Sequence, residues 1–116
     1  MRDLRERTFD FGLRIIRISK QVPNSKENIV LVRQLLRAGT SIGANVEEAE
    51  AAYTRQEFSY KMSIALKEAR ETQYWLRLVK ESNIVQSDHL DALISEAEEL
   101  KKILGSIVAK TRRPLK

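Results

Sequence analysis

Three glutamates, Glu47, Glu48 and Glu50, crowd one short stretch of the sequence. Clustered carboxylates can bind metal ions or act as acid/base groups in enzymes. A di-iron site in a helical bundle, however, needs glutamates from several helices and two Glu-x-x-His pairs. The chain has one histidine and no Glu-x-x-His. We therefore expect no metal site and interpret the three glutamates as solvated or interface-pairing residues, with a ligand role as the alternative.

Glu50 differs from its two neighbours because it falls near an apolar helix face. A buried or half-buried carboxylate needs a cationic partner, and Lys20 and Lys101 also fall near such faces. Either lysine is a candidate partner for Glu50. The single histidine, His89, follows Asp88 and is interpreted as a polar residue in the first turn of a helix.

Nucleophilic catalysis is not indicated by any motif. The chain has no cysteine, no Gly-x-Ser-x-Gly elbow and no glycine-rich phosphate loop, and "GTSIG" lacks the lysine of a Walker loop. No histidine base lies within predictable reach of the serines on predicted helices. We therefore expect no catalytic residues, no cofactor and no enzymatic activity. The serines concerned are Ser19, Ser41, Ser59, Ser63 and Ser106.

Basic residues give the chain a formal net charge of +5. An excess of lysine and arginine favours polyanions, so RNA or DNA is a candidate partner through contacts to phosphates. No helix-turn-helix or other recognition motif is present, and a solvated basic surface is the alternative interpretation. The candidate nucleic-acid contacts are Arg5, Arg7, Arg14, Arg17, Arg33, Arg37, Lys110, Arg112 and Arg113.

The sequence contains few helix breakers, because glycine and proline together number six. The pattern predicts helices over about 8–21, 25–53, 54–82 and 88–110. Asn24 or Ser25, Thr54 and Ser87 are the expected N-caps. Short connections predict a single domain, residues 1–116, folded as an all-α, antiparallel up-down-up-down four-helix bundle, with flexible ends at about 1–7 and 111–116.

No apolar run is long enough to cross a bilayer, and the charged start is unlike a secretory signal. We therefore expect a cytoplasmic protein that does not contact membranes.

Helical periodicity predicts which side of each helix is buried. The first helix is expected to bury Phe9, Leu13 and Ile16, and the second to place Gly39, Gly43 and Tyr53 on its core side. The third and fourth helices show regular apolar seams, Phe58 to Val79 and Leu90 to Ile107. The two glycines reduce helix propensity, so we expect them to allow close approach of another helix, plausibly at Ala65 and Ala69.

A second apolar stripe remains on two helices after these assignments. One bundle core cannot bury both sides of a helix, so the extra stripes predict self-association. The alternative is that twist and loops bring some of them into the same core. The candidate oligomer interface is Phe11, Ile15, Ile18, Tyr60, Ile64, Trp75 and Leu78, with Ser41, Asn45 and Glu48 as a polar contact.

The sequence also resembles a known family. The run "RQLLRAGTSIGANVEEAEAAYTRQEFSYKMSIALKEARETQYWLRLVKESNI" and the later "AEELKKILGSIVAKTRR" are similar to bacterial four-helix-bundle proteins encoded in intervening sequences of 23S rRNA genes. Ala49 stands where many relatives have glycine. The resemblance implies an antiparallel bundle, a homopentamer and an unassigned biochemical role.

At the level of fold, the chain is also similar to the accessory protein of diversity-generating retroelements. That resemblance implies a basic pentameric barrel that binds nucleic acid and reverse transcriptase. A protein-interaction scaffold without nucleic-acid binding is the alternative function.

Overall fold

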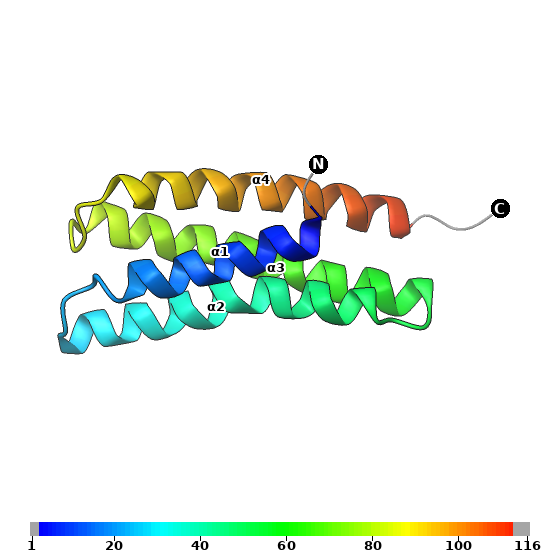
Figure 1. The fold of residues 1–116 in the computed structure, drawn as a ribbon, viewed down its shortest axis with the longest axis horizontal. Helices are drawn as coiled ribbons and strands as arrows, with labels where there is room; N and C mark the ends of the chain where they lie inside the picture. The colour runs from blue at the N-terminus through cyan, green and yellow to red at the C-terminus, as the bar shows by residue number, and fades with distance from the viewer. Residues whose placement is uncertain (1–2, 113–116) are drawn as a thin grey trace.

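The computed structural model describes residues 3–112, and within this range the chain forms four helices. They are α1 (Leu4–Ser19), α2 (Lys26–Glu50), α3 (Arg55–Glu81) and α4 (Asp88–Thr111). Successive helices run in opposite directions and lie along one another (Figure 1). The predicted antiparallel four-helix bundle is confirmed.

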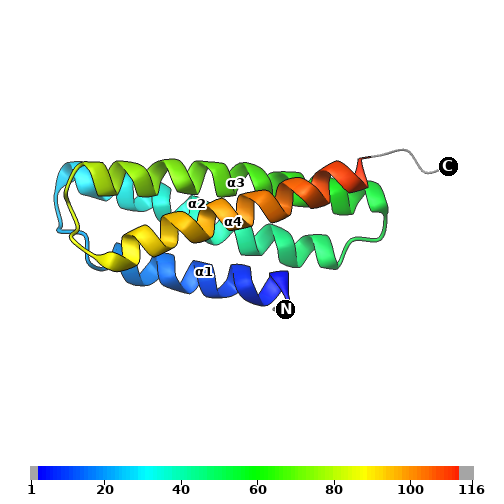
Figure 2. The same cartoon turned by 90° about the horizontal axis from the view of Figure 1, so that it is seen from above.

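Polar contacts between helices show the same antiparallel order. Lys61, near the start of α3, lies 2.7 Å from Glu48, near the end of α2. Lys80, near the end of α3, lies 2.8 Å from Asp91, near the start of α4. Seen from above, α4 crosses the bundle diagonally, nearer α1 at its start and nearer α3 at its end (Figure 2).

The expected N-caps position the starts of three helices. The side chains of Ser25, Thr54 and Ser87 each accept a backbone hydrogen bond from the first turn of α2, α3 and α4. The prediction that α2 continues to Tyr53 is wrong, because residues 51–54 are needed to reverse the chain before Thr54 can cap α3. Tyr53 is 98% exposed instead of lying in the seam.

The first helix begins earlier than predicted. Asp3 caps α1 by accepting a hydrogen bond from the backbone N–H of Arg5. Arg7 then donates two hydrogen bonds to the carboxylate of Glu96 on α4, at 2.7 and 2.8 Å. Residues 4–7, expected to belong to a flexible end, are therefore helical. The rest of that predicted end, residues 1–2, and residues 113–116 at the other end lie outside the described residues.

The predicted seams of α3 and α4 are confirmed. Their apolar residues at steps of three and four form the core together with α2, and Phe58 and Ile107 pack against its edge. The buried members on these two helices include Met62, Ala65, Ala69, Leu76, Val79, Leu90, Leu93, Ala97, Leu100 and Leu104.

The predicted core side of α1 is wrong. Phe11 and Ile15 are 0% exposed and Ile18 is 2% exposed, whereas Phe9 is 62% exposed and Ile16 is 38% exposed. Phe11, Ile15 and Ile18 therefore belong to the core of the bundle and cannot form the oligomer interface predicted for them.

Two glycines on α2 explain this rotation of α1. A methyl group at Gly39 would lie 2.8 Å from the two Cγ atoms of Ile15, and one at Gly43 would lie 3.2 Å from the carbonyl oxygen of Thr8. Both distances are shorter than an optimal carbon contact. The close approach predicted for these glycines is therefore real, but the partner is α1 and not Ala65 or Ala69 of α3.

A pair of glycine-to-alanine variants tests this contact. Gly105→Ala should raise the free energy of unfolding by about 1 kcal/mol, because alanine has the higher helix propensity and nothing lies within 4 Å of the added methyl group. Gly39→Ala should lower it, because overpacking against buried Ile15 costs about 1–3 kcal/mol. Urea unfolding of both variants measures the difference; equal stabilisation would contradict the close contact.

Candidate interaction surfaces

A polar network joins the outer sides of α2 and α3. The guanidinium of Arg37 donates to Glu68 at 3.3 Å and also to Glu71. Glu71 accepts a second hydrogen bond from the indole nitrogen of Trp75 at 2.9 Å, and Gln34 accepts one from Arg37 Nε at 3.2 Å. One arginine is thus shared between two carboxylates, one of which orients the tryptophan.

The network changes the interpretation of Arg37. The Glu68 side chain is only 13% exposed, so its charge is partly removed from water and requires a partner. An arginine bound to two carboxylates attracts a phosphate less strongly than an unpaired arginine does. Arg37 thus joins α2 to α3, and its predicted contact with nucleic acid stays a prediction.

Apolar and polar side chains surround this network on the same side of the bundle. Tyr60 is 62% exposed and Leu78 is 36% exposed, while Ile64 and Trp75 are half-buried. We call this surface the α2–α3 face and define it by Ser41, Asn45, Glu48, Tyr60, Ile64, Trp75 and Leu78. These residues, predicted from two separate segments, come together because Glu48 pairs with Lys61 and Arg37 reaches Glu71.

Tyr74 is a neighbour that the sequence reasoning missed. It is 53% exposed, and its ring meets that of Trp75 edge to face, with centroids 5.1 Å apart and planes at 72°. Tyr74 lies four residues before Leu78, and this helical spacing could have identified it.

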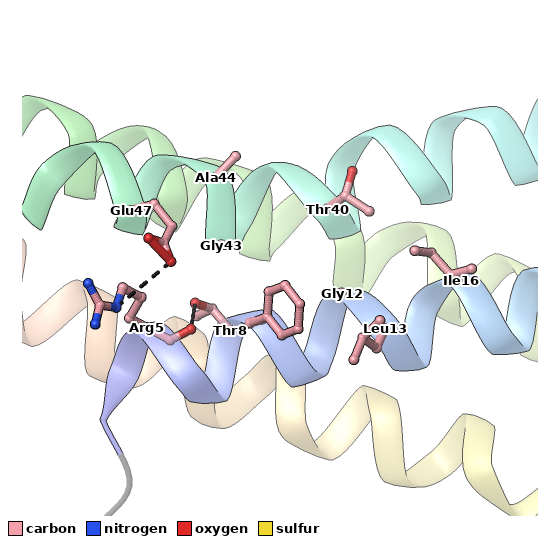
Figure 3. A pocket seen from close by; sticks show the side chains of 10 residues that line it. Arg5, Thr8, Gly12, Leu13, Ile16, Thr40, Gly43, Ala44 and Glu47 are labelled. Atoms are coloured by element: carbon pink, nitrogen blue, oxygen red, sulfur yellow. Dashed lines mark hydrogen bonds and ion pairs between the residues drawn. The ribbon is translucent and has the colours of Figure 1, made fainter.

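A second apolar surface lies between α1 and α2. It is a groove of about 330 Å³ with an ion pair, Arg5 to Glu47 at 3.8 Å, at one end (Figure 3). We call it the α1–α2 groove. Its apolar walls come from the side of α1 that was predicted to be buried, so the sequence reasoning missed it. The lining residues are Arg5, Thr8, Phe9, Gly12, Leu13, Ile16, Thr40, Gly43, Ala44 and Glu47.

The predicted nucleic-acid contacts on α1 fall into two groups. Arg7 is bound by Glu96, and this hydrogen bond raises the pKa of Arg7. Arg5 lies 3.8 Å from both Asp3 and Glu47. Arg14 and Arg17, by contrast, make no side-chain hydrogen bond or ion pair with residues 3–112.

The remaining basic residues lie elsewhere. Arg33 is exposed on α2, and Lys110 and Arg112 lie at the end of α4, where Arg112 borders a groove with Arg55. Arg14 and Arg17 lie beside the start of α4, at the opposite end of that helix from Lys110 and Arg112. Arg113 lies outside the described residues.

The acidic group does not converge on a site. Glu47 is near Arg5, Glu50 is exposed, and Glu48 accepts from Lys61, which raises the pKa of that lysine. Between residues 3 and 112, no three His, Asp or Glu side chains are arranged to hold a metal ion.

The predicted pairing of Glu50 with Lys101 is wrong. The ammonium of Lys101 lies 2.8 Å from Glu98 on its own helix. The hydrogen bond that Glu98 accepts from Lys101, and to a smaller extent the one that it accepts from Gln73, lower the pKa of Glu98.

In the described range, no helix is both long enough and apolar enough to cross a membrane.

Comparisons with known proteins agree with this architecture. The family model for the 23S rRNA-intervening sequence protein matches residues 3–106, and the chain belongs to this family. It is similar to the crystal structure of a protein of unknown function from the S23 ribosomal protein family of Bacteroides thetaiotaomicron. The two chains are 38% identical, the TM-score is 0.84, and the match covers 91% of this chain and 98% of that chain. A search of curated proteins gives no match.

The role of Glu71 in orienting Trp75 can be tested by fluorescence, because Trp75 is the only tryptophan. Glu71→Ala removes the acceptor of the indole N–H and should shift the emission spectrum and lower the free energy of unfolding by about 1 kcal/mol. Glu81→Ala, on an exposed position of the same helix, should leave the spectrum unchanged. Identical spectra for Glu71→Ala and wild type would contradict the orienting hydrogen bond.

Proposed function

We propose that this chain is a non-enzymatic bundle that works as a homo-oligomer. The observation that carries the proposal is the presence of two exposed apolar surfaces, the α2–α3 face and the α1–α2 groove, outside a core that is already filled. Scattered exposed apolar residues are ordinary, but contiguous ones indicate an interaction site.

The two surfaces differ in shape and composition, which favours contact between unlike faces. The α1–α2 groove is concave and largely apolar, whereas the α2–α3 face carries the exposed ring of Tyr60, and the exposed ring of Tyr74 packs edge to face on Trp75. If the face of one copy occupies the groove of the next, repetition builds a ring when the rotation closes. Five copies is the number that the family resemblance implies.

A second candidate function, contact with RNA or DNA through phosphates, is favoured by the charge of +5 and by Arg14 and Arg17. Similarity to the retroelement accessory protein stays a prediction. Binding of a protein partner without nucleic acid is the alternative.

Self-association can be tested with Leu78→Glu on the α2–α3 face and Phe9→Glu in the α1–α2 groove. Both positions are exposed, so each variant should keep its helical circular dichroism, whereas Ile15→Glu would bury a charge in the core. Sedimentation velocity should show an oligomeric wild type, and a charge at an apolar contact should weaken association about tenfold or more.

Ser106→Glu is the matched control, because it adds the same charge at an exposed position of α4. It should leave the oligomer intact. On dissociation, the emission of Trp75 should move to longer wavelength as the indole enters water. A monomeric wild type would end the proposal of self-association.

Nucleic-acid contact can be tested by measuring the affinity for RNA and duplex DNA across salt concentrations. The logarithm of the affinity should fall linearly with the logarithm of salt, by about 0.7 per contacted phosphate on a single strand and about 0.9 on a duplex. No binding at low salt, or salt-insensitive binding, would contradict phosphate contact. A protein partner that stays bound in a pull-down after nuclease treatment would favour the scaffold.

A further inference from the structure

A cationic groove lies between α1 and the start of α4, and we propose that it binds a phosphate group. The groove measures about 400 Å³ and is lined by Arg14, Arg17 and Gln21 of α1 and by His89 of α4, above the buried side chains of Ile18 and Leu93. The sequence reasoning treated the two arginines as parts of a general basic surface and His89 as an isolated polar residue. The structure places them together.

Within the described residues, Arg14 and Arg17 form no ion pair with a carboxylate, unlike Arg5 and Arg7 of the same helix. Arg7, about two turns before Arg14, donates two hydrogen bonds to Glu96. Arg14 and Arg17 also border the adjoining groove that contains Arg7, Asp10 and Glu96, yet neither forms a hydrogen bond or an ion pair with any described residue. Their charge is therefore available to a ligand.

Carboxylates at the start of α4 lie on a different side. Asp91 pairs with Lys80 of α3 at 2.8 Å, and Asp88 borders the loop groove that also contains Lys80. Of the first-turn residues, His89 lines the groove beside α1. The amino-terminal end of α4, with its partial positive charge, reinforces attraction of an anion to this side.

The number of donors favours phosphate over a carboxylate. Arginines three residues apart lie on the same side of a helix, with Cβ atoms about 5–6 Å apart, so their guanidinium groups can reach one ligand. The imidazole of His89 can donate in its neutral form, and the amide of Gln21 adds two more N–H groups. A phosphate presents three or four oxygens to these donors, whereas a carboxylate presents two.

The same chemistry fits a phosphate of the nucleic-acid backbone and the phosphate of a small ester. Binding of a nucleic-acid phosphate rests on the proposed function, and binding of a small phosphate ester does not.

The double variant Arg14→Gln with Arg17→Gln removes two charges from the groove and is called the groove variant. Arg70→Gln with Arg77→Gln is the matched control, because it removes the same charge from exposed positions of α3 outside the groove.

The first measurement is a titration of the isotope-labelled protein with inorganic phosphate, followed by NMR, with chloride at equal ionic strength as the reference. The amide signals of His89 and its neighbours should shift saturably in wild type and in the α3 control. They should not shift in the groove variant. Because Arg14 and Arg17 make no hydrogen bond or ion pair with other described side chains, the groove variant should keep its fold, which its unchanged remaining signals would show.

The second measurement is the affinity for a single-stranded RNA and for adenosine monophosphate. If the ligand is a phosphate of the nucleic-acid backbone, the groove variant should bind RNA about tenfold more weakly than wild type. The slope of its log affinity against log salt should become shallower by about 1, with little change in the control. Binding of phosphate and adenosine monophosphate without RNA binding supports the groove with a small ester as its ligand and rejects the nucleic-acid function.

Two results would contradict the proposal that this groove binds phosphate. One is the absence of saturable phosphate shifts in wild type. The other is a phosphate shift at His89 that persists unchanged in the groove variant. Equal loss of RNA affinity in the groove and control variants would assign RNA binding to overall charge and would reject only the nucleic acid as the ligand of this groove.

Discussion

The close approach of α1 to α2 at Gly39 and Gly43 is the constraint on which the exposed surfaces depend. With Ile15 against Gly39 and the Thr8 backbone against Gly43, α1 has little freedom to rotate about its axis. Its rotation decides which apolar stripe enters the core and which one faces outward. A bulkier residue at either glycine would push α1 away from the bundle, because close-packed interiors cannot absorb an added side chain without movement.

The rest of the core could be predicted from the sequence, because α3 and α4 each have one regular apolar seam. Helix α1 has two apolar stripes, and periodicity measures their spacing without saying which one meets a neighbour. The buried stripe is also interrupted by polar residues: Thr8 is 1% exposed and Ser19 is 8% exposed. Each hydroxyl donates to a carbonyl of its own helix, Thr8 to Arg5 and Ser19 to Ile15, so both are buried without an unpaired hydrogen bond. Because these two buried positions carry polar residues, the apolar pattern of the sequence alone makes the buried stripe look shorter than it is.

The polar surfaces could be predicted only in part, for a related reason. A charge that looks available in the sequence can be neutralised by a residue far along the chain, and the helix register decides which one. Arg37 meets Glu68 and Glu71, more than thirty positions away, and Arg7 meets Glu96. Arg14 has the same residue type and the same predicted role, but its register on α1 brings no such partner to it from residues 3–112. Tyr60 and Leu78 are exposed, as the sequence predicts, because they lie opposite a clear seam on α3, and their role in an interface stays a prediction.

The rotation of α1 also connects the apolar and cationic surfaces. Leu13 lines the α1–α2 groove and also borders the groove of Arg7 and Glu96, and Arg14 and Arg17 follow directly after Leu13 and Ile16. A neighbouring copy that covered Leu13 and Ile16 would therefore leave the two arginines at the margin of the contact, still open toward α4. In a ring, each copy would add its pair of arginines at an equivalent position. Self-association would then multiply the cationic groove and not bury it, and a polyanion that spans several copies would gain affinity from the repetition.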